Sequence, residues 1–190
     1  MTSLILGLAA FLGVHSIAIV APGWRARTIA RLGEGPWKGL YSLVSIASFV
    51  LLIWGYGLAR QHPIVVYTPP IWMRHLAAVL MLPVFPLGFS AYFPGRIKTA
   101  FKHPLLAAVK FWALAHLLVN GMLADLLLFG GFLAWAVADR ISLKRRTQHI
   151  PTAPPSKLND AVAVILGLGV YALLIFWLHL RLIGVSPLPL

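Results

Sequence analysis

Residues 104–138 read PLLAAVKFWALAHLLVNGMLADLLLFGGFLAWAVA, two apolar runs separated by the dipeptide Asn120-Gly121. Asn-Gly is typical of tight turns, and each run has close to the roughly 17–25 residues that a helix needs to cross a bilayer. The stretch therefore predicts a hairpin of two membrane helices, at 104–120 and 122–138. Without a turn at this dipeptide the two runs would form one helix, and the chain would have five spans instead of six.

Four further apolar runs of membrane-spanning length lie at 3–21, 37–59, 71–93 and 159–182. Hydrophobic residues form 60% of the chain, charged residues only 11%, and the mean hydropathy is +0.87, which is far from an ordinary soluble domain. The sequence predicts one all-α domain over residues 1–190, a polytopic bundle of about six transmembrane helices in the lipid bilayer. The first run has no basic residue before Leu4, so we expect a retained helix and not a signal peptide.

The basic residues predict the orientation of this bundle. Most of the 16 Lys and Arg residues follow the first, third and fifth runs, which the positive-inside rule assigns to the cytoplasm, with both termini outside. The net charge of +12 therefore indicates membrane topology, and no nucleic-acid partner is expected. Residues 142–158 contain three prolines and predict a flexible cytoplasmic linker before the last helix.

The chain contains no cysteine, which excludes disulfides, thiolate metal sites and iron–sulfur clusters. Its acidic residues are Glu34, Asp125, Asp139 and Asp160, and none falls well inside a predicted helix. A catalytic zinc site often includes a carboxylate, and a di-iron carboxylate site requires several. Both kinds of site are therefore disfavoured, and any metal must be held by nitrogen or oxygen ligands.

Three histidines, His15, His75 and His116, lie inside apolar runs, where an ionisable side chain indicates a functional site. Their alternative role is an interhelical hydrogen bond, but three of them in one chain favour a cofactor shared by at least two. A fourth, His103, precedes Pro104 and is expected to cap a helix or to turn inward as a ligand. The remaining histidines are assigned to connections or to a helix end: His62, His149 and His179.

A non-covalent b-type haem suits these histidines, because one or two axial imidazoles hold it and an apolar bundle accommodates the macrocycle. The C-x-x-C-H motif for covalent attachment is absent. His75 and His116 lie at similar predicted depths, whereas His15 lies about 10–12 Å from His116 along the membrane normal. Depth alone therefore does not decide whether His75 or His15 pairs with His116. Lys110, in the middle of its helix, is expected to meet a haem propionate or to reach toward the membrane surface.

A set of short motifs extends over nearly the whole chain: GVHS at 13–16, GEGPWKGLYS at 33–42, WGYG at 54–57, HPL at 103–105, WALAHLLVNG at 112–121, FG at 129–130, WAV at 135–137 and RR at 145–146. Together they resemble the NnrU family of bacterial inner-membrane proteins. The resemblance implies a multi-pass protein of the inner membrane, linked to nitrite and nitric oxide reduction in denitrifying bacteria.

The NnrU family is similar to zeta-carotene isomerase, a haem b membrane enzyme whose ligating histidines match His15 and His116. The resemblance therefore implies these two residues as iron ligands, with His75 and His103 as reserves for cofactor binding. The isomerase has a cysteine three residues before its second histidine, where this chain has Ala113. That difference weakens the transfer of the carotenoid substrate more than the transfer of the haem.

We therefore expect a haem protein that supports nitrite or nitric oxide reduction by redox or sensing chemistry, with a membrane redox partner or reductase. A first alternative is a haem-dependent cis/trans isomerase of a carotenoid-like lipid, with a lateral opening at a helix kink expected at Pro83 and Pro86. That kink either opens a pocket beside His75 or only fits a bend in the bundle. A second alternative is a non-catalytic assembly factor for a reductase, whose histidines only form hydrogen bonds between helices.

Overall fold

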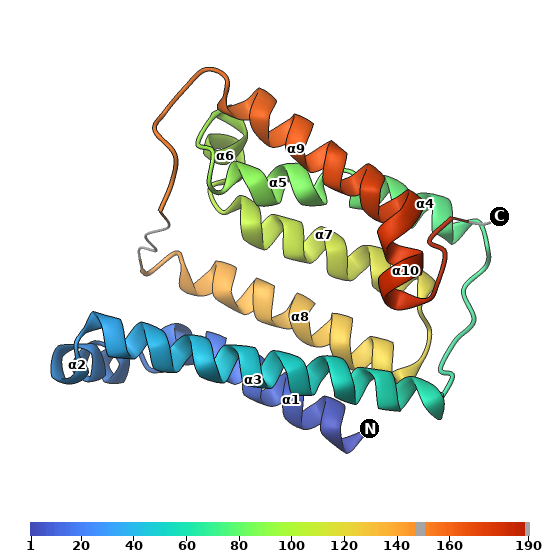
Figure 1. The fold of residues 1–190 in the computed structure, drawn as a ribbon, viewed down its shortest axis with the longest axis horizontal. Coiled ribbons are helices and arrows are strands. Elements are labelled where there is room, and N and C mark those ends of the chain that lie inside the picture. The colour runs from blue at the N-terminus through green and yellow to red at the C-terminus, as the bar shows by residue number, and fades with distance from the viewer. Residues whose placement is uncertain (147–150, 189–190) are drawn as a thin grey trace.

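The computed structural model describes residues 1–146 and 151–188, and its regular elements are all helices (Figure 1). The prediction of an all-α fold is therefore confirmed for this part of the chain. The elements are α1 (Thr2–Val20), α2 (Pro22–Leu32), α3 (Glu34–Gln61), α4 (Met73–Met81), α5 (Val84–Ser90), α6 (Arg96–Phe101), α7 (Pro104–Val119), α8 (Leu123–Ser142), α9 (Asn159–Leu173), the π-helix η1 (Leu174–Leu178) and α10 (His179–Ile183).

The long helices pack in a spatial order that differs from their order in the chain. α3 packs against α1, α1 against α8, α8 against α7, α7 against α4 and α5, and α5 against α9. Figure 1 shows this series from α1 and α3 at the bottom to α9 at the top. The α7–α8 hairpin therefore occupies the centre of the molecule, with the N-terminal helices on one side and α4, α5 and α9 on the other.

Four segments are long and apolar enough to cross a membrane: Thr2–Val20, Glu34–Gln61, Met73–Ser90 and Asn159–Ile183. α7 is also apolar but has only 16 residues. This corresponds to about 24 Å of helix, against a hydrocarbon core of about 30 Å. α8 has 20 residues but carries Asp125, Asp139 and Arg140. The helices thus suggest a membrane protein, while the total of six spans stays a prediction.

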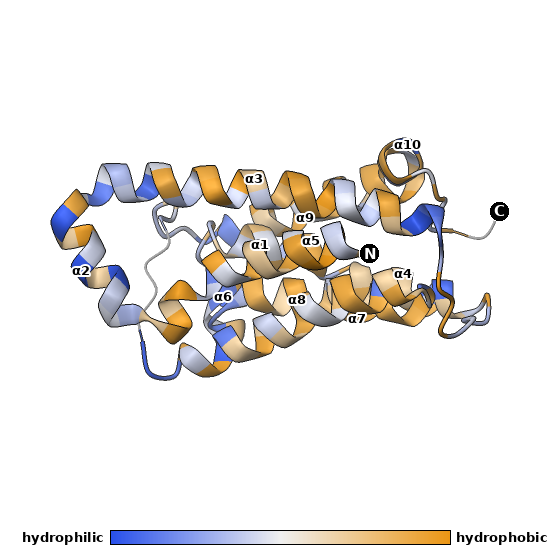
Figure 2. Ribbon diagram, turned by 90° about the horizontal axis from the view of Figure 1, so that it is seen from below, coloured by the Kyte–Doolittle hydropathy of each residue, from blue (hydrophilic) through white to orange (hydrophobic). Residues whose placement is uncertain are grey.

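The strongly basic segments gather at one end of the bundle. Figure 1 shows α2, α6 and the C-terminal end of α8 at the left, and the start of α4 and the C-terminus at the right. Figure 2 shows hydrophilic colouring toward these two ends and mainly hydrophobic helices between them. A membrane protein that follows the positive-inside rule has this distribution. The side of the membrane that each end faces stays a prediction.

The predicted turn at Gly121 joins α7 to α8. The connection after α3 passes so close to this turn that a Cβ on Gly121 would overlap the carbonyl oxygen of Tyr67. Backbone hydrogen bonds join the two segments, because Val66 N donates to Gly121 O at 2.8 Å. Leu123 N donates to Ile64 O, also at 2.8 Å. Only glycine fits at this position without displacing the neighbouring backbone.

The predicted kink at Pro83 separates α4 from α5. One turn later, α9 packs very closely against Pro86, so that a Cβ on Gly167 would lie 2.6 Å from the Cα of Pro86. Such close approach at a glycine is typical of helix packing in membranes. The bend therefore serves helix contact, and His75 lies on an exposed part of α4. Met81 and Phe85, on either side of the break, line a cavity, whereas His75 does not.

Two helical features lie outside the sequence predictions. α2 is an exposed basic helix that carries Trp24, Arg25, Arg27 and Arg31. An amphipathic helix with basic residues and tryptophan is typical of a membrane interface. η1 is a π-helical turn inside the C-terminal helix. Such turns are rare in proteins, and those that occur often lie at functional sites.

The start of α9 is held to the segment around α6, although the sequence predicts a flexible linker before this helix. The carboxylate of Asp160 accepts hydrogen bonds from Arg96 N at 2.8 Å and from Ile97 N at 3.1 Å. Ala153 N donates to Tyr92 O at 2.8 Å. Tertiary contacts therefore hold both the described end of the linker and the last helix against α5 and α6.

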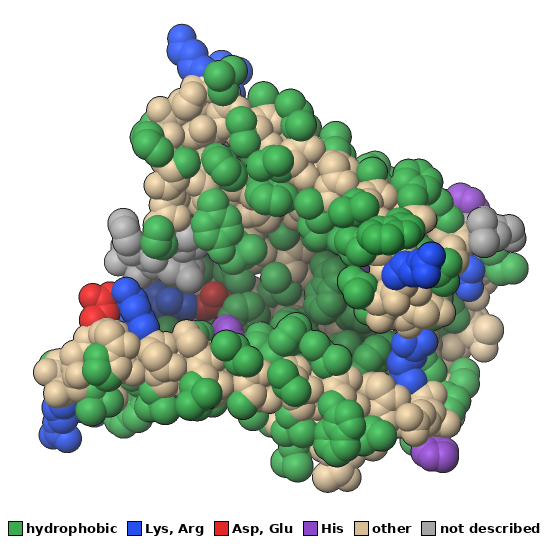
Figure 3. Space-filling view, in the orientation of Figure 1, with side chains coloured by type: hydrophobic (Ala, Val, Ile, Leu, Met, Phe, Trp, Pro, Cys, Tyr) green, Lys and Arg blue, Asp and Glu red, His purple; other side chains and the backbone are tan. Residues whose placement is uncertain are grey.

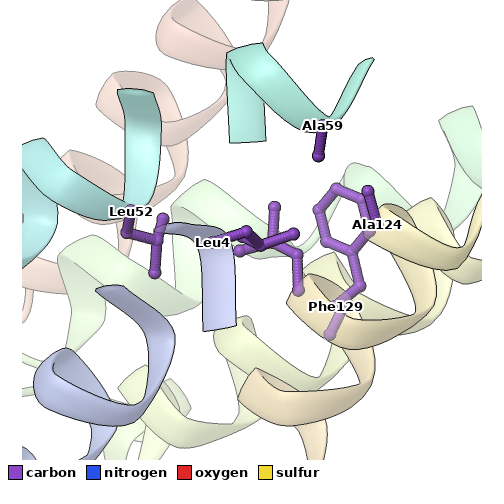
Figure 4. Packing of buried hydrophobic residues seen from close by; sticks show 7 residues of the cluster. Leu4, Leu52, Ala59, Ala124 and Phe129 are labelled. Carbon is purple, nitrogen blue, oxygen red and sulfur yellow. The ribbon is translucent and has the colours of Figure 1, made fainter. Parts of the chain in front are cut away.

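Buried side chains of α1, α3, α7 and α8 form the main hydrophobic core (Figure 4). Its members are Leu4, Leu52, Ala59, Ala113, Ala124, Leu128 and Phe129. Two glycines allow α1 and α3 to approach closely. A Cβ on Gly7 would lie 2.6 Å from the Cα of Leu52, and a Cβ on Gly55 would lie 2.6 Å from the carbonyl carbon of Ser3. These helices are thus packed backbone against backbone.

A buried carboxylate lies where α8 begins. Asp125 is fully buried, and its oxygens accept hydrogen bonds from Tyr56 OH at 2.6 Å and from Met122 N at 3.1 Å. The second of these bonds caps the N-terminus of α8. The first connects α8 to α3. Both carboxylate oxygens are therefore satisfied in an otherwise apolar core.

Replacing Gly121 with valine is expected to lower the free energy of unfolding by at least about 3 kcal/mol, because the side chain must push the Tyr67 backbone away. Thermal unfolding in detergent measures the loss. Gly130→Val is the matched control, since Gly130 lies on α8 with open space beside its Cα. Equal unfolding temperatures for the two variants would contradict the close contact at Gly121.

Replacing Asp125 with alanine is expected to cost about 2–4 kcal/mol, because Tyr56 OH and Met122 N both lose their acceptor. Tyr56→Phe removes only one of the two bonds and is expected to cost about 1 kcal/mol. Thermal unfolding of both variants and of the double variant compares the two contributions. A Tyr56→Phe loss as large as that of Asp125→Ala would show that the α8 cap contributes nothing.

Candidate functional site

His116 lies on α7 and faces α8. A carbonyl oxygen can only accept a hydrogen bond, so the 2.8 Å contact with Trp112 O places the proton on His116 Nδ1. The imidazole ring stacks on Phe129, with centroids 4.6 Å apart. Nε2 therefore keeps its lone pair and is available to a metal. A backbone hydrogen bond from the other ring nitrogen is the usual way in which a metal-ligating histidine is oriented.

A cavity of about 130 Å³ borders His116 between α4, α7 and the C-terminal helices. Its wall is mainly apolar and includes Ala77, Ala78, Met81 and Phe85. Its polar lining residues are Arg74, His116, Asn120, Tyr171, His179 and Ser186. The cavity therefore combines an apolar surface with two imidazoles and a guanidinium group.

His179, which the sequence assigns to a helix end, lines the same cavity as His116. Its Nδ1–H donates to Val185 O at 2.7 Å, so that Nε2 carries the lone pair here too. The residue directly follows the π-helical turn η1. No local sequence signal marks it, because the C-terminal helix reaches α4 and α7 only through tertiary packing. Sequence reasoning therefore missed a second imidazole at this cavity.

His15 lies on α1 among aromatic side chains. Its Nδ1–H donates to Phe11 O at 2.7 Å, the same bond to a carbonyl four residues earlier that His116 forms. Its ring centroid lies 4.2 Å from that of Phe11, 5.5 Å from Tyr41 and 6.2 Å from Trp135. His15 and His116 thus share one local arrangement, in which Nδ1 is bound and Nε2 is left for another partner.

The structure does not place His15 and His116 on one cavity, because aromatic rings stand between them. Phe11, which stacks on His15, lies 5.7 Å from Phe132 between centroids. Phe132 lies 5.4 Å from Trp112, and Trp112 lies 5.3 Å from His116. The two predicted iron ligands are therefore connected by contacting rings and not by open space.

Two buried side-chain polar atoms have no hydrogen-bond partner among the described residues, Ser45 Oγ and Trp135 Nε1. Trp135 meets the ring of His15 edge-on. Ser45 lies on α3 one turn after Tyr41, which also contacts His15. Buried polar atoms without partners are rare, and they often indicate a water or ligand. The surroundings of His15 therefore form a second candidate site.

The other residues predicted for the site lie apart from these two places. His75 is exposed on α4, and His62 is exposed after α3. His103 immediately precedes α7 and lines a different cavity, at the basic end of the bundle. Lys110 is partly buried in the middle of α7. His149 lies outside the described residues.

One protein family, described as NnrU protein, matches residues 3–187 of the chain. No curated protein and no solved structure matches the chain. The family match extends from α1, which carries His15, through α7, which carries His116, to the C-terminal segment after α10. Because it covers nearly every residue, the chain belongs to the NnrU family.

Proposed function

We propose that this NnrU protein is a b-type haem protein of the bacterial inner membrane, and that it supports nitrite or nitric oxide reduction by redox or sensing chemistry. The observation that carries the proposal is the arrangement of His116. Its Nδ1 is bound to a backbone carbonyl, and its Nε2 is left for a ligand beside an apolar cavity. The haem and the link to denitrification are inferred from the resemblance to the family. Six spans with both termini outside are part of the same proposal.

The residues around His116 suit a haem better than a bare metal ion. Among the described residues, no three His, Asp or Glu side chains gather as ligands for an ion, whereas a haem requires only one or two imidazoles. Arg74 lines the cavity and can pair with a propionate. The cavity of about 130 Å³ is smaller than a pocket for a drug-sized ligand, about 300–1,000 Å³. Haem binding therefore also requires this cavity to enlarge.

Two histidines could hold the haem iron together with His116. The family resemblance favours His15, and the unpartnered atoms of Ser45 and Trp135 beside it support a bound group there. Shared ligation with His116 would require the intervening rings to reorient. His179 already lines the His116 cavity with its Nδ1 bound to a carbonyl. Replacing each of these two histidines with alanine therefore tests which one is the second ligand.

A bound haem would supply one-electron transfer or a binding site for nitric oxide. The residues of this chain set the conditions for that chemistry. The bond from His116 Nδ1 to Trp112 O fixes the ring and raises the basicity of Nε2. The apolar side chains of α4 and α5 exclude water, and Arg74 provides a positive charge at the same cavity.

A second candidate function is the cis/trans isomerisation of a carotenoid-like lipid, and one observation favours it. An apolar groove of about 350 Å³ lies between α5 and α7, lined by side chains that include Phe85, Gly88 and Trp112. Phe85 also lines the His116 cavity. The ring of Trp112 lies 5.3 Å from that of His116. A linear apolar molecule in this groove would thus lie beside the proposed haem.

The haem proposal predicts a Soret band and b-type bands on reduction in the detergent-purified protein. His116→Ala is expected to lose most of the bound haem, because it removes the ligand nitrogen. His15→Ala and His179→Ala are compared in the same way. The one that removes the second ligand is expected to change the spectrum of the bound haem. His62→Ala is the control, since His62 is exposed in a connection. A colourless wild type from cells supplied with haem precursor would contradict the proposal and favour the assembly-factor alternative.

The isomerase alternative predicts that the protein converts a cis-carotenoid to its trans isomer, measured by chromatography of the products. Gly88→Leu is expected to lower this activity by about tenfold by filling the groove. It should leave the haem spectrum unchanged, because a Cβ on Gly88 meets no neighbouring atom. Absence of trans product with a haem-loaded wild type would eliminate this alternative and leave the redox role.

A further inference from the structure

A second cavity, separate from the one at His116, lies at the basic end of the bundle. It measures about 330 Å³ and lies between the end of α5, α6, the start of α7 and α8. Its polar lining residues are Lys98, Lys102, His103, Trp135, Asp139 and Thr152. Figure 3 shows a hollow in the molecule with basic, acidic and histidine side chains gathered at its left end. The chemistry of this cavity is therefore polar and charged, unlike the groove at Trp112.

Two lysines give this cavity a positive charge. Lys98 Nζ donates one hydrogen bond to Ala91 O at 2.9 Å, which places the ammonium group at the wall and leaves two N–H donors. Lys102 lines the cavity just after α6. The acidic lining residue, Asp139, forms an ion pair with Arg146. Its charge is thus compensated by arginine, and it does not neutralise the lysines.

The start of α7 adds further donors. Pro104 is the first helical residue, and no side chain in the described structure caps this end of the helix. The N–H groups of Leu105 and Leu106 therefore have no carbonyl partner within the helix, and both residues line the cavity. The helix dipole contributes a positive partial charge at the same place. Lys98 of α6, Lys102 just after α6 and the first residues of α7 thus line one space.

His103 lines the same cavity. Burial lowers the pKa of His103, and the positive charges of Arg140, Arg146 and Lys102 lower it further, whereas Asp139 raises it. The remaining lining of the cavity is apolar, from Leu105, Leu106 and the ring of Trp135. The cavity is thus lined by cationic and amide groups together with hydrocarbon.

We propose that this cavity binds the phosphate group of an anionic phospholipid, with Lys98, Lys102 and the first amides of α7 as donors. Free inorganic phosphate has the same charge chemistry, but it makes no use of the apolar wall. The cavity also lies at the end where α2, α6 and the end of α8 gather their basic residues (Figure 1). Such clusters attract anionic head groups. The site is separate from the cavity at His116, because no residue lines both cavities.

Lipid affinity of the full chain in detergent tests this site, with short-chain phosphatidylglycerol, zwitterionic phosphatidylcholine and inorganic phosphate as probes in native mass spectrometry. Phosphatidylglycerol is expected to bind most tightly. The double variant Lys98→Gln/Lys102→Gln is expected to bind it at least roughly tenfold more weakly. Lys144→Gln/Lys157→Gln is the matched control, because it removes the same charge from exposed positions outside the cavity. The control should keep wild-type affinity.

Three results would overturn the proposal: equal affinity for the two lipids, an equal loss in both double variants, or binding of inorganic phosphate without any preference for phosphatidylglycerol. The last would assign the cavity to a soluble phosphate. Lys102→Arg keeps the charge and is expected to keep the lipid affinity. If the double variant unfolds, Lys102→Gln alone is used, since Lys102 is exposed. It is expected to weaken binding about threefold.

Discussion

The contact between the Gly121 turn and the connection after α3 is the constraint on which the rest of the bundle depends. Two backbones meet there at a distance that no side chain tolerates, and hydrogen bonds from Val66 and Leu123 hold them together. The contact fixes α7 and α8 as an antiparallel pair at the centre of the helix series. α8 can then pack on α1, and α7 on α4 and α5. His116 stacks on Phe129 because this hairpin is closed.

Several serine and histidine side chains in this apolar bundle form hydrogen bonds with the backbone of their own helix. Ser16 and Ser48 donate to carbonyls four residues earlier, and His15 and His116 do the same through Nδ1. For serine this bond uses the only donor, whereas histidine retains a second nitrogen. An imidazole bound in this way is stable in an apolar environment and still available as a ligand. This is the physical basis of the proposed site.

α7 connects the two proposed sites. Its N-terminus, with His103 just before it, borders the charged cavity, and His116 borders the apolar cavity near its C-terminus. A helix N-terminus favours an anion, and the apolar surroundings near the other end favour a hydrophobic group. The short, apolar α7 therefore has different binding properties at its two ends. α8 supplies a wall to the first site through Trp135 and a stacking partner to the second through Phe129.

The sequence by itself determined the helical class, the turn at Gly121 and the break at Pro83, because hydrophobic length, turn residues and proline act locally. The choice of His15 and His116 as ligands comes from the family resemblance and stays a prediction. The tertiary structure decided which histidines meet. His179 joins His116 at one cavity, whereas His15 lies behind aromatic rings of α1, α7 and α8. The spatial order of the helices depends on close backbone approaches at glycines such as Gly55 and Gly167. Those contacts join residues far apart in the chain, and no local pattern of apolar residues specifies them.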